Sequence, residues 1–461
     1  MILKKKKMNS LLKNSLILAS LLISFSSNST ELLDDKLKEA LISTYNFSPK
    51  LKVEKENLYE KDELLPQAFS EFRPTIKGYY EKGKIDSAIS GSNIISDGIR
   101  TETNSGITLT QPIFNGGSSL KKISEAKNKI NSQRYIYKHN EQLVFLEAIR
   151  LYSSVSSKIK ELVLNNKNVE FLKKQLDLAE DQFNIGELTL TDVSIAQSRL
   201  LLSKSDLIRS QSELFALSSK YQSLIGMKPN EPMITEIFPE LKSEINKMKE
   251  NLITSNPEII SIEFEIKSLK NYISSLHRKK FPLVKLEAEA QKNKGYFRSD
   301  SAREVLSAYA TIDIPLYQSG LSSSKIRESK RKLISLQEFK KFKLNELKYN
   351  LDYSWSLFTS ASSKINAYKK QIEANNKFLE GLKQELFLGE RTLLDILDAE
   401  QELIESEFNL IKVYEQQFNS YFEILFYTGK LTSKNLNLPV NHFDETENFN
   451  DVKYRWLDLV E

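Results

Sequence analysis

Apolar and small residues recur with heptad spacing in two stretches of the chain. The first series is Val193, Ala196, Leu200, Ser203, Leu207, Ser210, Leu214, Leu217, Tyr221 and Leu224; the second is Ile396, Ala399, Leu403, Ser406, Leu410, Val413, Gln417, Ser420 and Ile424. Alternating steps of three and four residues predict long helices that pack along one side. A further series beside the second one consists of Ile404, Ile411, Phe418 and Leu425. Two series on one helix indicate neighbours on both sides, and their small or polar members favour a wall around a wet interior.

Two other segments alternate between apolar and polar residues with the period of a strand. Residues 282–291 set Val284, Leu286, Ala288 and Ala290 against Lys285, Glu287, Glu289 and Gln291, and residues 305–314 alternate in the same way. Strands of about ten residues with one apolar and one polar face are typical of a membrane barrel with a wet lumen. A hairpin lying on a soluble core would show the same alternation, so both interpretations stay open.

A second, weaker strand pair is predicted earlier in the chain. Residues 75–81 and 106–111 flank a segment rich in Gly, Ser and Asn, which predicts a loop over residues 83–105. Four strands cannot close a barrel, because the smallest membrane barrels use about eight. Several chains would therefore have to contribute.

The chain contains the same unit twice. Pro112 and Pro315, Gly186 and Gly389, and Gly226 and Gly429 are each 203 residues apart, whereas Pro74 and Pro282 are 208 apart. The first copy therefore carries five extra residues between Pro74 and Pro112, which predicts an exposed hairpin there. No Pro or Gly interrupts residues 118–185, a stretch of 68 residues that would form a helix about 100 Å long.

These patterns predict the following organisation. The first repeat covers residues 30–229, with a hairpin at about 74–112, a long helix at 118–185, a tip turn at 186–190 and a return helix at 191–226. The second covers residues 230–431, with a hairpin at about 282–315, a long helix at 321–388, a tip turn at 389–392 and a return helix at 393–428. Residues 432–461 lose all periodicity and are expected to form a loosely held tail, although a core role for Trp456 stays open.

The first 29 residues have the order of a secretory signal peptide. Four lysines at residues 4–7 precede the apolar run 16–25, and small polar residues follow it. Ten apolar residues span about 15 Å as a helix, half of the hydrocarbon core, so a signal is favoured over a membrane span. A buried core helix is the alternative.

The charge balance and the missing cysteines exclude several classes of function. Residues 1–30 hold five lysines and no acid, so the remaining chain has 66 − 5 = 61 basic and 61 acidic residues. A neutral chain gives no electrostatic support for nucleic-acid binding. The absence of Cys excludes disulfides, thiolate catalysis, Cys-ligated metals and an acylated-Cys anchor. His139, His277 and His442 share no ligand spacing and no catalytic set is visible, so neither an enzyme nor a cofactor or metal is expected.

Four motifs resemble the TolC family of outer-membrane efflux proteins. They are Gln111-Pro-Ile-Phe-Asn-Gly-Gly117, Ile185-Gly-Glu-Leu-Thr-Leu-Thr-Asp-Val193, Ile314-Pro-Leu-Tyr-Gln-Ser-Gly320 and Leu388-Gly-Glu-Arg-Thr-Leu-Leu-Asp-Ile-Leu-Asp-Ala-Glu-Gln401. The resemblance implies a mainly α fold with a small membrane β-barrel, in which a homotrimer forms a twelve-stranded barrel on a periplasmic α-helical barrel. It also implies an outer-membrane location and a role as exit duct of tripartite efflux or type I secretion. The implied partners are a periplasmic adaptor protein, an inner-membrane transporter of the RND or ABC type, and outer-membrane lipid.

The resemblance also assigns roles at the helix tips. It implies pore-constriction acids at Asp395 and Asp398, and a gate latch made by Thr191, Asp192 and Arg391. It further implies tip turns that an adaptor grips, at Gly186, Glu187, Gly389 and Glu390. The family's tyrosine partner of the latch falls on Leu386 here, so one latch hydrogen bond is absent or rebuilt.

A purely structural role competes for two of these acids. Thr189 with Asp192, and Thr392 with Asp395, have the spacing of capping boxes, in which the acid at the third helical position completes the N-terminal cap. Asp398 has Ile195 as its counterpart in the first repeat, so a cap does not require it and a pore-lining role is favoured.

Two other functions remain as alternatives to the duct. A secreted trimeric coiled-coil envelope scaffold or adhesin would also need a signal peptide and long heptads, but has no use for two-faced strands or acids at the tip. An enzyme on a helical scaffold is disfavoured because no catalytic set is visible.

Overall fold

The computed structural model describes residues 33–86, 98–232, 234, 238 and 244–456. The predicted signal peptide, residues 1–29, lies outside the described residues. The described residues divide into two compact units: the first falls within residues 33–54, 137–257 and 344–443, and the second within residues 55–136, 258–343 and 444–456. Each unit therefore draws residues from both sequence repeats. Among the described residues, no helix carries an apolar stretch long enough to cross a membrane.

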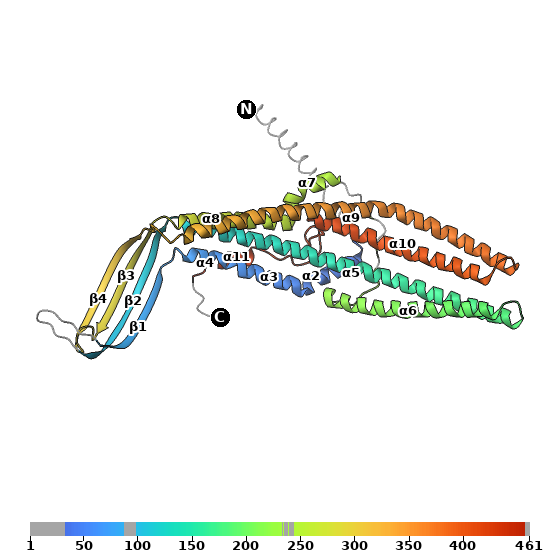
Figure 1. The fold of residues 1–461 in the computed structure, drawn as a ribbon, viewed down its shortest axis with the longest axis horizontal. Helices are drawn as coiled ribbons and strands as arrows, with labels where there is room; N and C mark the ends of the chain where they lie inside the picture. Colours follow the sequence, from blue (N-terminus) through green and yellow to red (C-terminus); the bar gives the residue numbers. More distant parts are fainter. Residues whose placement is uncertain (1–32, 87–97, 233, 235–237, 239–243, 457–461) are drawn as a thin grey trace, which may run out of the picture. The chain divides into compact units, whose positions relative to one another are not determined.

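Helices make up the described part of the first unit (Figure 1). It contains α2 (Asp35–Phe47), α6 (Leu190–Ile225), α7 (Ile245–Ser255), α10 (Leu393–Tyr427) and the later parts of α5 (Ser118–Asn184) and α9 (Leu321–Phe387). Its main core joins α2, α5, α6 and α10, and includes Leu37, Leu41, Phe145, Ile149, Tyr152, Tyr221, Phe418 and Phe422. The predicted heptad series supply Tyr221 and Phe418 to this core, and Leu214, Leu217, Leu224 and Leu425 pack against it. On α10 both series are buried in part, at Leu403 and Ser406 in one and at Ile404 and Phe418 in the other, so α10 does have neighbours on two sides.

Gly429 follows α10 and lies against the end of α7. Its φ is +76°, and a Cβ at this position would come within 2.2 Å of the Ser255 carbonyl oxygen. Gly389 has the same φ, but a Cβ there would meet nothing within 4 Å. An Ala at Gly389 would therefore cost backbone strain alone, whereas an Ala at Gly429 would add a clash with the Ser255 carbonyl oxygen.

We expect Gly429→Ala to destabilise the protein by about 2–3 kcal/mol, because strain and a backbone clash add together. Gly389→Ala should cost only about 1 kcal/mol, from the left-handed backbone alone. The unfolding midpoints of the two purified variants check this prediction. Equal losses would show that the segment around Ser255 moves aside without cost.

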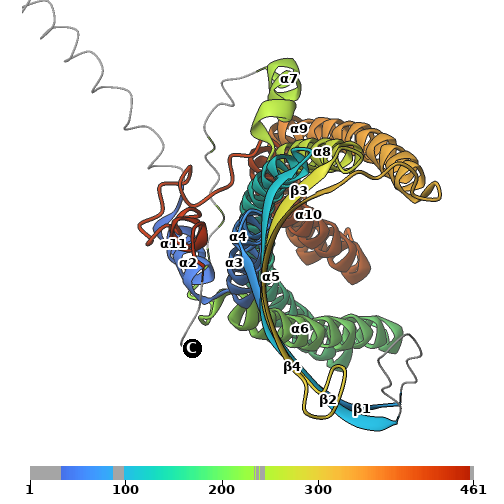
Figure 2. The same ribbon diagram turned by 90° about the vertical axis from the view of Figure 1, so that its left-hand side faces the viewer.

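The second unit combines a sheet with the other helices. Its helices are α4 (Leu64–Ser70), α11 (Glu447–Val452), most of α3 (Pro49–Asp62) and of α8 (Pro257–Arg278), and the first parts of α5 and α9. Four antiparallel strands lie side by side in chain order: β1 (Thr75–Asp86), β2 (Ile99–Asn115), β3 (Leu283–Lys294) and β4 (Ala302–Asp313). They bend together into one curved sheet (Figure 2). β1 and β4 are the edges, with no further strand paired to either among the described residues.

The predicted two-faced alternation is confirmed across the sheet. The register pairs Ala288 of β3 with Ala308 of β4 and with Leu109 of β2, and Leu109 in turn with Ile76 of β1. The alternate positions form the polar face, where Tyr79 Oη donates to Glu289 Oε1 at 2.9 Å. Because side chains point to opposite faces with a period of two, the register aligns one apolar and one polar face over all four strands.

The predicted loop over residues 83–105 is wrong at both ends. Residues 83–86 belong to β1 and residues 99–105 to β2, paired with each other from Gly83↔Glu102 to Asp86↔Ile99. Gly, Ser and Asn carry no strand signal, but the ladder hydrogen bonds depend on the partner strand and not on those side chains. Residues 87–97 lie outside the described part of the chain.

The prediction of a loosely held C-terminal tail is also wrong for the described residues up to 456. In the first unit Leu438 is buried in the core, and the Ser433 N–H donates to Glu141 Oε1 at 2.9 Å. In the second unit Asn448 Nδ2 donates to Asp62 Oδ2 at 3.0 Å. Trp456 is no core residue: it is 66% exposed, with the Arg73 guanidinium 4.6 Å from its ring centroid. Contacts with other elements hold the tail in place although its sequence lacks periodicity.

Candidate functional site

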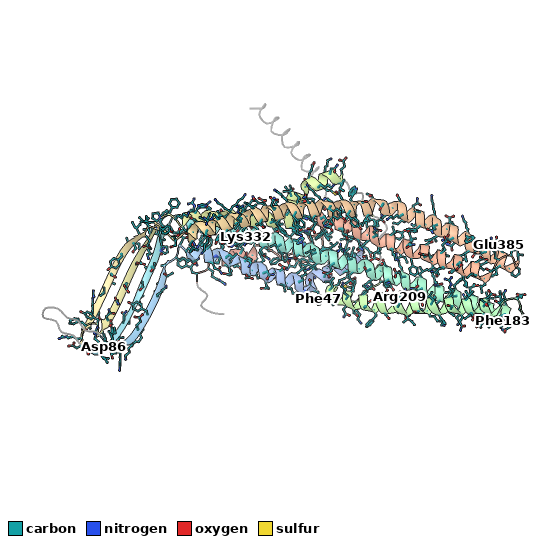
Figure 3. The ribbon with its side chains drawn as sticks, viewed as in Figure 1. Phe47, Asp86, Phe183, Arg209, Lys332 and Glu385 are labelled. Carbon is teal, nitrogen blue, oxygen red and sulfur yellow. The ribbon has the colours of Figure 1, made fainter. Side chains whose placement is uncertain are left out.

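Two tip turns of nearly identical geometry join the paired helices of the first unit. Gly186 follows α5 with φ +84°, and Gly389 follows α9 with φ +76°. In each turn the glycine N–H donates to the carbonyl three residues earlier, and the next N–H donates to the carbonyl five residues earlier, all at 2.9 Å. Glu187 and Glu390, the residues after the glycines, are exposed. Figure 3 places Phe183 and Glu385, beside the two turns, at the same end of the helices.

Both return helices begin with the predicted capping box. Asp192 N–H donates to Thr189 Oγ1 at 3.3 Å, and Thr189 N–H donates back to Asp192 Oδ2 at 2.9 Å. Thr392 and Asp395 repeat these bonds at 3.3 and 2.9 Å. Asp192 and Asp395 therefore both have a structural role, whatever else they do.

The caps also set the ionisation of these two acids. The side-chain hydrogen bond from Thr189, followed by its backbone N–H, lowers the pKa of Asp192; for Asp395 the backbone N–H of Thr392 contributes most. Because the folded-state pKa is lowered, each cap adds stability above the ordinary carboxyl pKa. That contribution is lost as the pH falls through the lowered value. Both carboxylates are therefore charged at neutral pH.

Asp398 is paired with a cation that the sequence motifs did not include. Arg199 of α6 places Nη2 2.9 Å from Asp398 Oδ1 of α10. Asp398 has 58% of its side chain exposed, so the pair lies at the surface. The contact joins the two helical hairpins of one chain, which are formed by α5 with α6 and by α9 with α10.

Apolar packing accompanies this ion pair. Leu393 and Leu397 of α10 belong to one buried cluster with Ala196 and Leu200 of α6, and Leu172 and Ala179 of α5 complete it. Leu200 is the direct neighbour of Arg199, and Leu397 the direct neighbour of Asp398. A polar contact at the margin of an apolar cluster fixes how α6 and α10 approach each other at the tip.

Arg391 makes its ion pair within its own hairpin. Its Nε lies 2.8 Å from Glu385 Oε2 of α9. Among the described residues Arg391 forms no hydrogen bond with Thr191 or Asp192, so a single chain does not assemble the predicted latch.

Sequence reasoning missed two charged groups near the tip, Arg199 and Glu400. Burial raises the pKa of Glu400, and the charge of Lys383 opposes this only in part. Arg199 lies one heptad after Asp192, beside the buried series of α6. A search for a basic residue at that position, opposite Asp398, could have found it.

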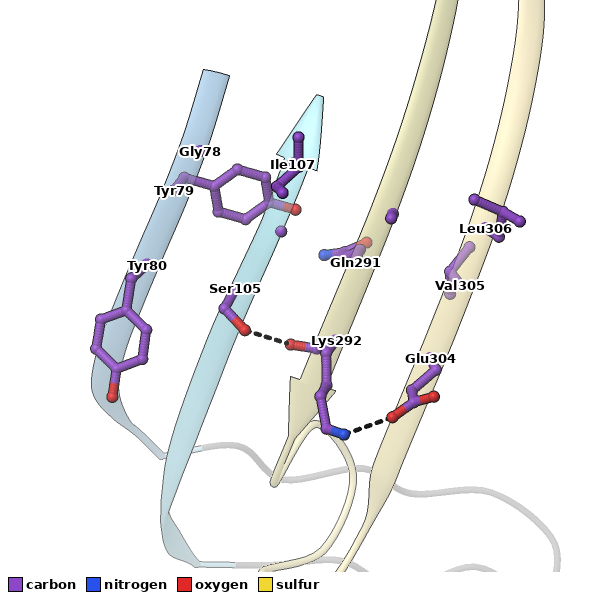
Figure 4. A pocket seen from close by; sticks show the side chains of 12 residues that line it. Gly78, Tyr79, Tyr80, Ser105, Ile107, Gln291, Lys292, Glu304, Val305 and Leu306 are labelled. Atoms are coloured by element: carbon purple, nitrogen blue, oxygen red, sulfur yellow. Dashed lines mark hydrogen bonds and ion pairs between the residues drawn. The ribbon is translucent and has the colours of Figure 1, made fainter. Parts of the chain in front are cut away.

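The apolar face of the sheet is the second functional feature, because it is openly exposed. Leu306 is 86% exposed, and Tyr80, Ile107 and Ile312 are each more than half exposed. On this sheet Tyr80, Ile107 and Leu306 border a hollow of about 840 Å³ (Figure 4). A large exposed apolar surface of this kind indicates contact with lipid or with another protein.

The comparisons with known proteins fit this architecture. The family described as "Outer membrane efflux protein" matches residues 47–216. The outer membrane efflux protein BepC of Brucella suis is 23% identical over 93% of this chain and 92% of its own length. The chain belongs to the TolC family of outer-membrane efflux proteins. The outer membrane protein TolC of Salmonella enteritidis is 20% identical, over 73% of this chain and 70% of its own length.

A solved structure shows the same fold. The Campylobacter jejuni CmeC outer membrane channel has a TM-score of 0.76 at 12% identity, covering 91% of this chain and 89% of its own. As a TolC-family protein the chain is an outer-membrane channel component that extends into the periplasm, and not an enzyme. The predicted family, mainly α fold and location are therefore confirmed. None of these three relatives is named as a scaffold or adhesin.

Proposed function

We propose that three copies of this chain form the exit duct of a tripartite efflux or type I secretion system, gated at the helix tips. The observation that carries the proposal is the open, four-stranded, two-faced sheet. It has an apolar face suited to lipid, a polar face suited to a lumen and two edges to which no described residues of the chain pair. Relatives named for efflux and for alkaline protease secretion support a proposal that covers both kinds of export.

The free edges require further copies. Inside a bilayer an unpaired strand edge leaves N–H and C=O groups without partners, so a spanning sheet has to close. Two copies would give eight strands, whose interior side chains fill the barrel. Three copies give 3 × 4 = 12 strands, enough for a wet passage, with β4 of one chain paired to β1 of the next.

An apolar stripe on α6 offers a second contact between copies. Leu201, Ile208 and Phe215 are seven residues apart and 58, 63 and 76% exposed. Heptad spacing places them on one side of α6, where a helix of a neighbouring chain would cover them. The stripe supports a closed ring of helices.

At the tips we propose that Asp398, with Asp395, forms the constriction. Three copies would place six carboxylates around the opening, which favours cations over anions. Arg199 balances part of this charge within each chain and holds the two hairpins together. Thr191, Asp192 and Arg391 are proposed to latch adjacent hairpins, in which case Arg391 exchanges its Glu385 partner for Asp192 of a neighbouring hairpin.

The tip turns are proposed to dock a periplasmic adaptor protein, which links the duct to an inner-membrane RND or ABC transporter. Gly186 and Gly389 leave open space beside the backbone, and Glu187 and Glu390 are exposed next to them. Docking would separate the tip hairpins, with the energy supplied by the transporter.

Planar-bilayer recording tests the gate. The assembled wild-type protein should pass small, cation-preferring currents. We expect Asp398→Asn to lower the cation preference, because it removes three carboxylates, and Arg391→Ala to raise the conductance, because it weakens the latch. Arg199→Ala should raise the cation preference, because it removes the counter-charge of Asp398.

Asp177→Asn is a matched control, since Asp177 is an exposed acid on α5. It should change neither selectivity nor conductance. A protein that forms no pores, or an Asp398→Asn variant with unchanged ion selectivity, would contradict the proposed gate.

A further inference from the structure

The helix-side end of the sheet carries a concentrated positive charge. Four segments connect the strands to the helices there: residues 71–74, 116–122, 278–282 and 314–327. Together they hold eight Lys or Arg residues and a single acid, Glu71. The nearest acids outside these segments are Asp313, which pairs with Lys285, and Glu125 and Glu328, which line one hollow with Lys325.

The opposite end of the sheet is nearly balanced. There residues 81–86, 98–102 and 292–304 hold seven Lys or Arg residues and five acids among the described residues. Asp86 marks this end in Figure 3. The excess is therefore 8 − 1 = 7 cations at the helix side and 7 − 5 = 2 at the far side.

Most cations at the helix-side end have no acidic partner among the described residues. Lys122 is paired with Glu71. Lys121, Lys279, Lys280, Lys325 and Arg327 form no ion pair within the described ranges, and Lys280 Nζ only donates to Ser323 Oγ at 3.3 Å. Nearby positive charge is also felt locally, because burial and the charge of Lys279 lower the pKa of Lys122. Cations at one end of a sheet without acidic partners suit an anionic ligand.

Exposed apolar side chains occupy the same end. Phe281 is 57% exposed, Leu120 61%, Tyr317 85% and Leu316 92%. Aromatic and aliphatic groups beside lysines are typical of the boundary between hydrocarbon and headgroups, where the ring or chain enters the apolar layer and the cation remains in water. In the proposed duct, on which this inference rests, the helix side of the sheet faces the periplasm, so this boundary belongs to the phospholipid leaflet on that side.

We propose that this basic collar binds anionic phospholipid headgroups of the periplasm-facing leaflet. The collar is defined as Lys121, Lys279, Lys280, Lys325 and Arg327. Headgroup phosphates supply the missing counter-charges, while acyl chains meet Phe281 and Leu316. The bound lipid holds the assembly at a fixed depth in the membrane. Retention of anionic lipid can be measured separately from ion conduction.

Native mass spectrometry of the assembled protein tests the collar. The protein in neutral detergent is mixed with equal amounts of phosphatidylglycerol and phosphatidylcholine. Wild type should retain phosphatidylglycerol in excess, and the triple variant Lys279→Gln/Lys280→Gln/Lys325→Gln should lose on the order of a hundredfold in affinity for it, from about fivefold per residue. The triple Lys→Arg variant should retain the lipid, and inorganic phosphate at millimolar concentration should not displace it.

The matched control is Lys82→Gln/Lys84→Gln/Arg303→Gln at the far end of the sheet, which should keep wild-type retention. If this control variant lost as much phosphatidylglycerol as the collar variant, the proposal would be overturned, because any cation on the sheet would then bind the lipid. The proposal is also overturned if the collar variant keeps its phosphatidylglycerol but changes the ion selectivity of the pore, since the cations would then line the lumen. Failure of the proposed gate would leave all these lipid measurements unchanged.

Discussion

Leu306→Arg is expected to abolish assembly of the protein in the outer membrane. Leu306 is 86% exposed on the apolar face of β4, near the middle of a twelve-residue strand. An Arg facing lipid at mid-depth costs about 2–4 kcal/mol, and a trimer would carry three. That total is comparable with the whole stability of an ordinary domain. Membrane flotation and the yield of assembled protein in detergent measure the effect.

Ser307→Arg is the matched control. Ser307 is the next residue of β4 and therefore points to the polar face, opposite Glu289 in the register. The new Arg would meet water and a carboxylate, so assembly should stay close to the wild-type yield. If both variants assembled equally well, or if Ser307→Arg failed and Leu306→Arg did not, the assignment of the lipid face would be wrong.

A cysteine pair on the two sheet edges should convert the protein into covalent trimers. The chain has no native Cys, so Tyr80→Cys in β1 can be combined in turn with Leu306→Cys, Ala308→Cys or Ala310→Cys in β4. Within one chain β1 and β4 are three strand spacings apart, about 14 Å, whereas a disulfide needs Cα atoms within about 7 Å. Any disulfide must therefore join two chains.

After oxidation, a non-reducing gel should show a ladder that ends at three chains for at least one of the three pairs. Leu109→Cys with Leu306→Cys is the control, because β2 is an interior strand and should give no ladder. A ladder that continues beyond three chains, or the absence of any linked species in all three pairs, would exclude the proposed closed trimer.

Local patterns predicted the elements of the fold well because each has a strong period or a clear end signal. The long helix predicted at 118–185 is observed as Ser118–Asn184, and the return helix predicted at 393–428 as Leu393–Tyr427. Thr189 and Thr392 mark the starts of return helices, since each forms the capping box that its sequence indicates. The strand ends at residues 83–86 and 99–105 were missed because their Gly, Ser and Thr residues have no apolar alternation.

The tip site was predicted only in part. The motifs located Asp395, Asp398 and Arg391, but no sequence period says which cation lies beside which acid. The structure pairs Asp398 with Arg199, 199 positions away, and Arg391 with Glu385 of its own hairpin. Which side chains pair depends on how two helices are rotated and how closely they approach, and that geometry is set by contacts throughout the tertiary structure.

The sequence by itself determined the duplicated unit, the long helices, the helix caps and the two-faced strands, because each follows from interactions between residues close in the chain. Only the tertiary structure decided the length of the first hairpin, the anchoring of the C-terminal tail and the Arg199–Asp398 contact. It also brought connecting segments 71–74, 116–122, 278–282 and 314–327 to one end of a single sheet, where their cations gather. These features depend on contacts between residues far apart in the chain, whose geometry no local period encodes.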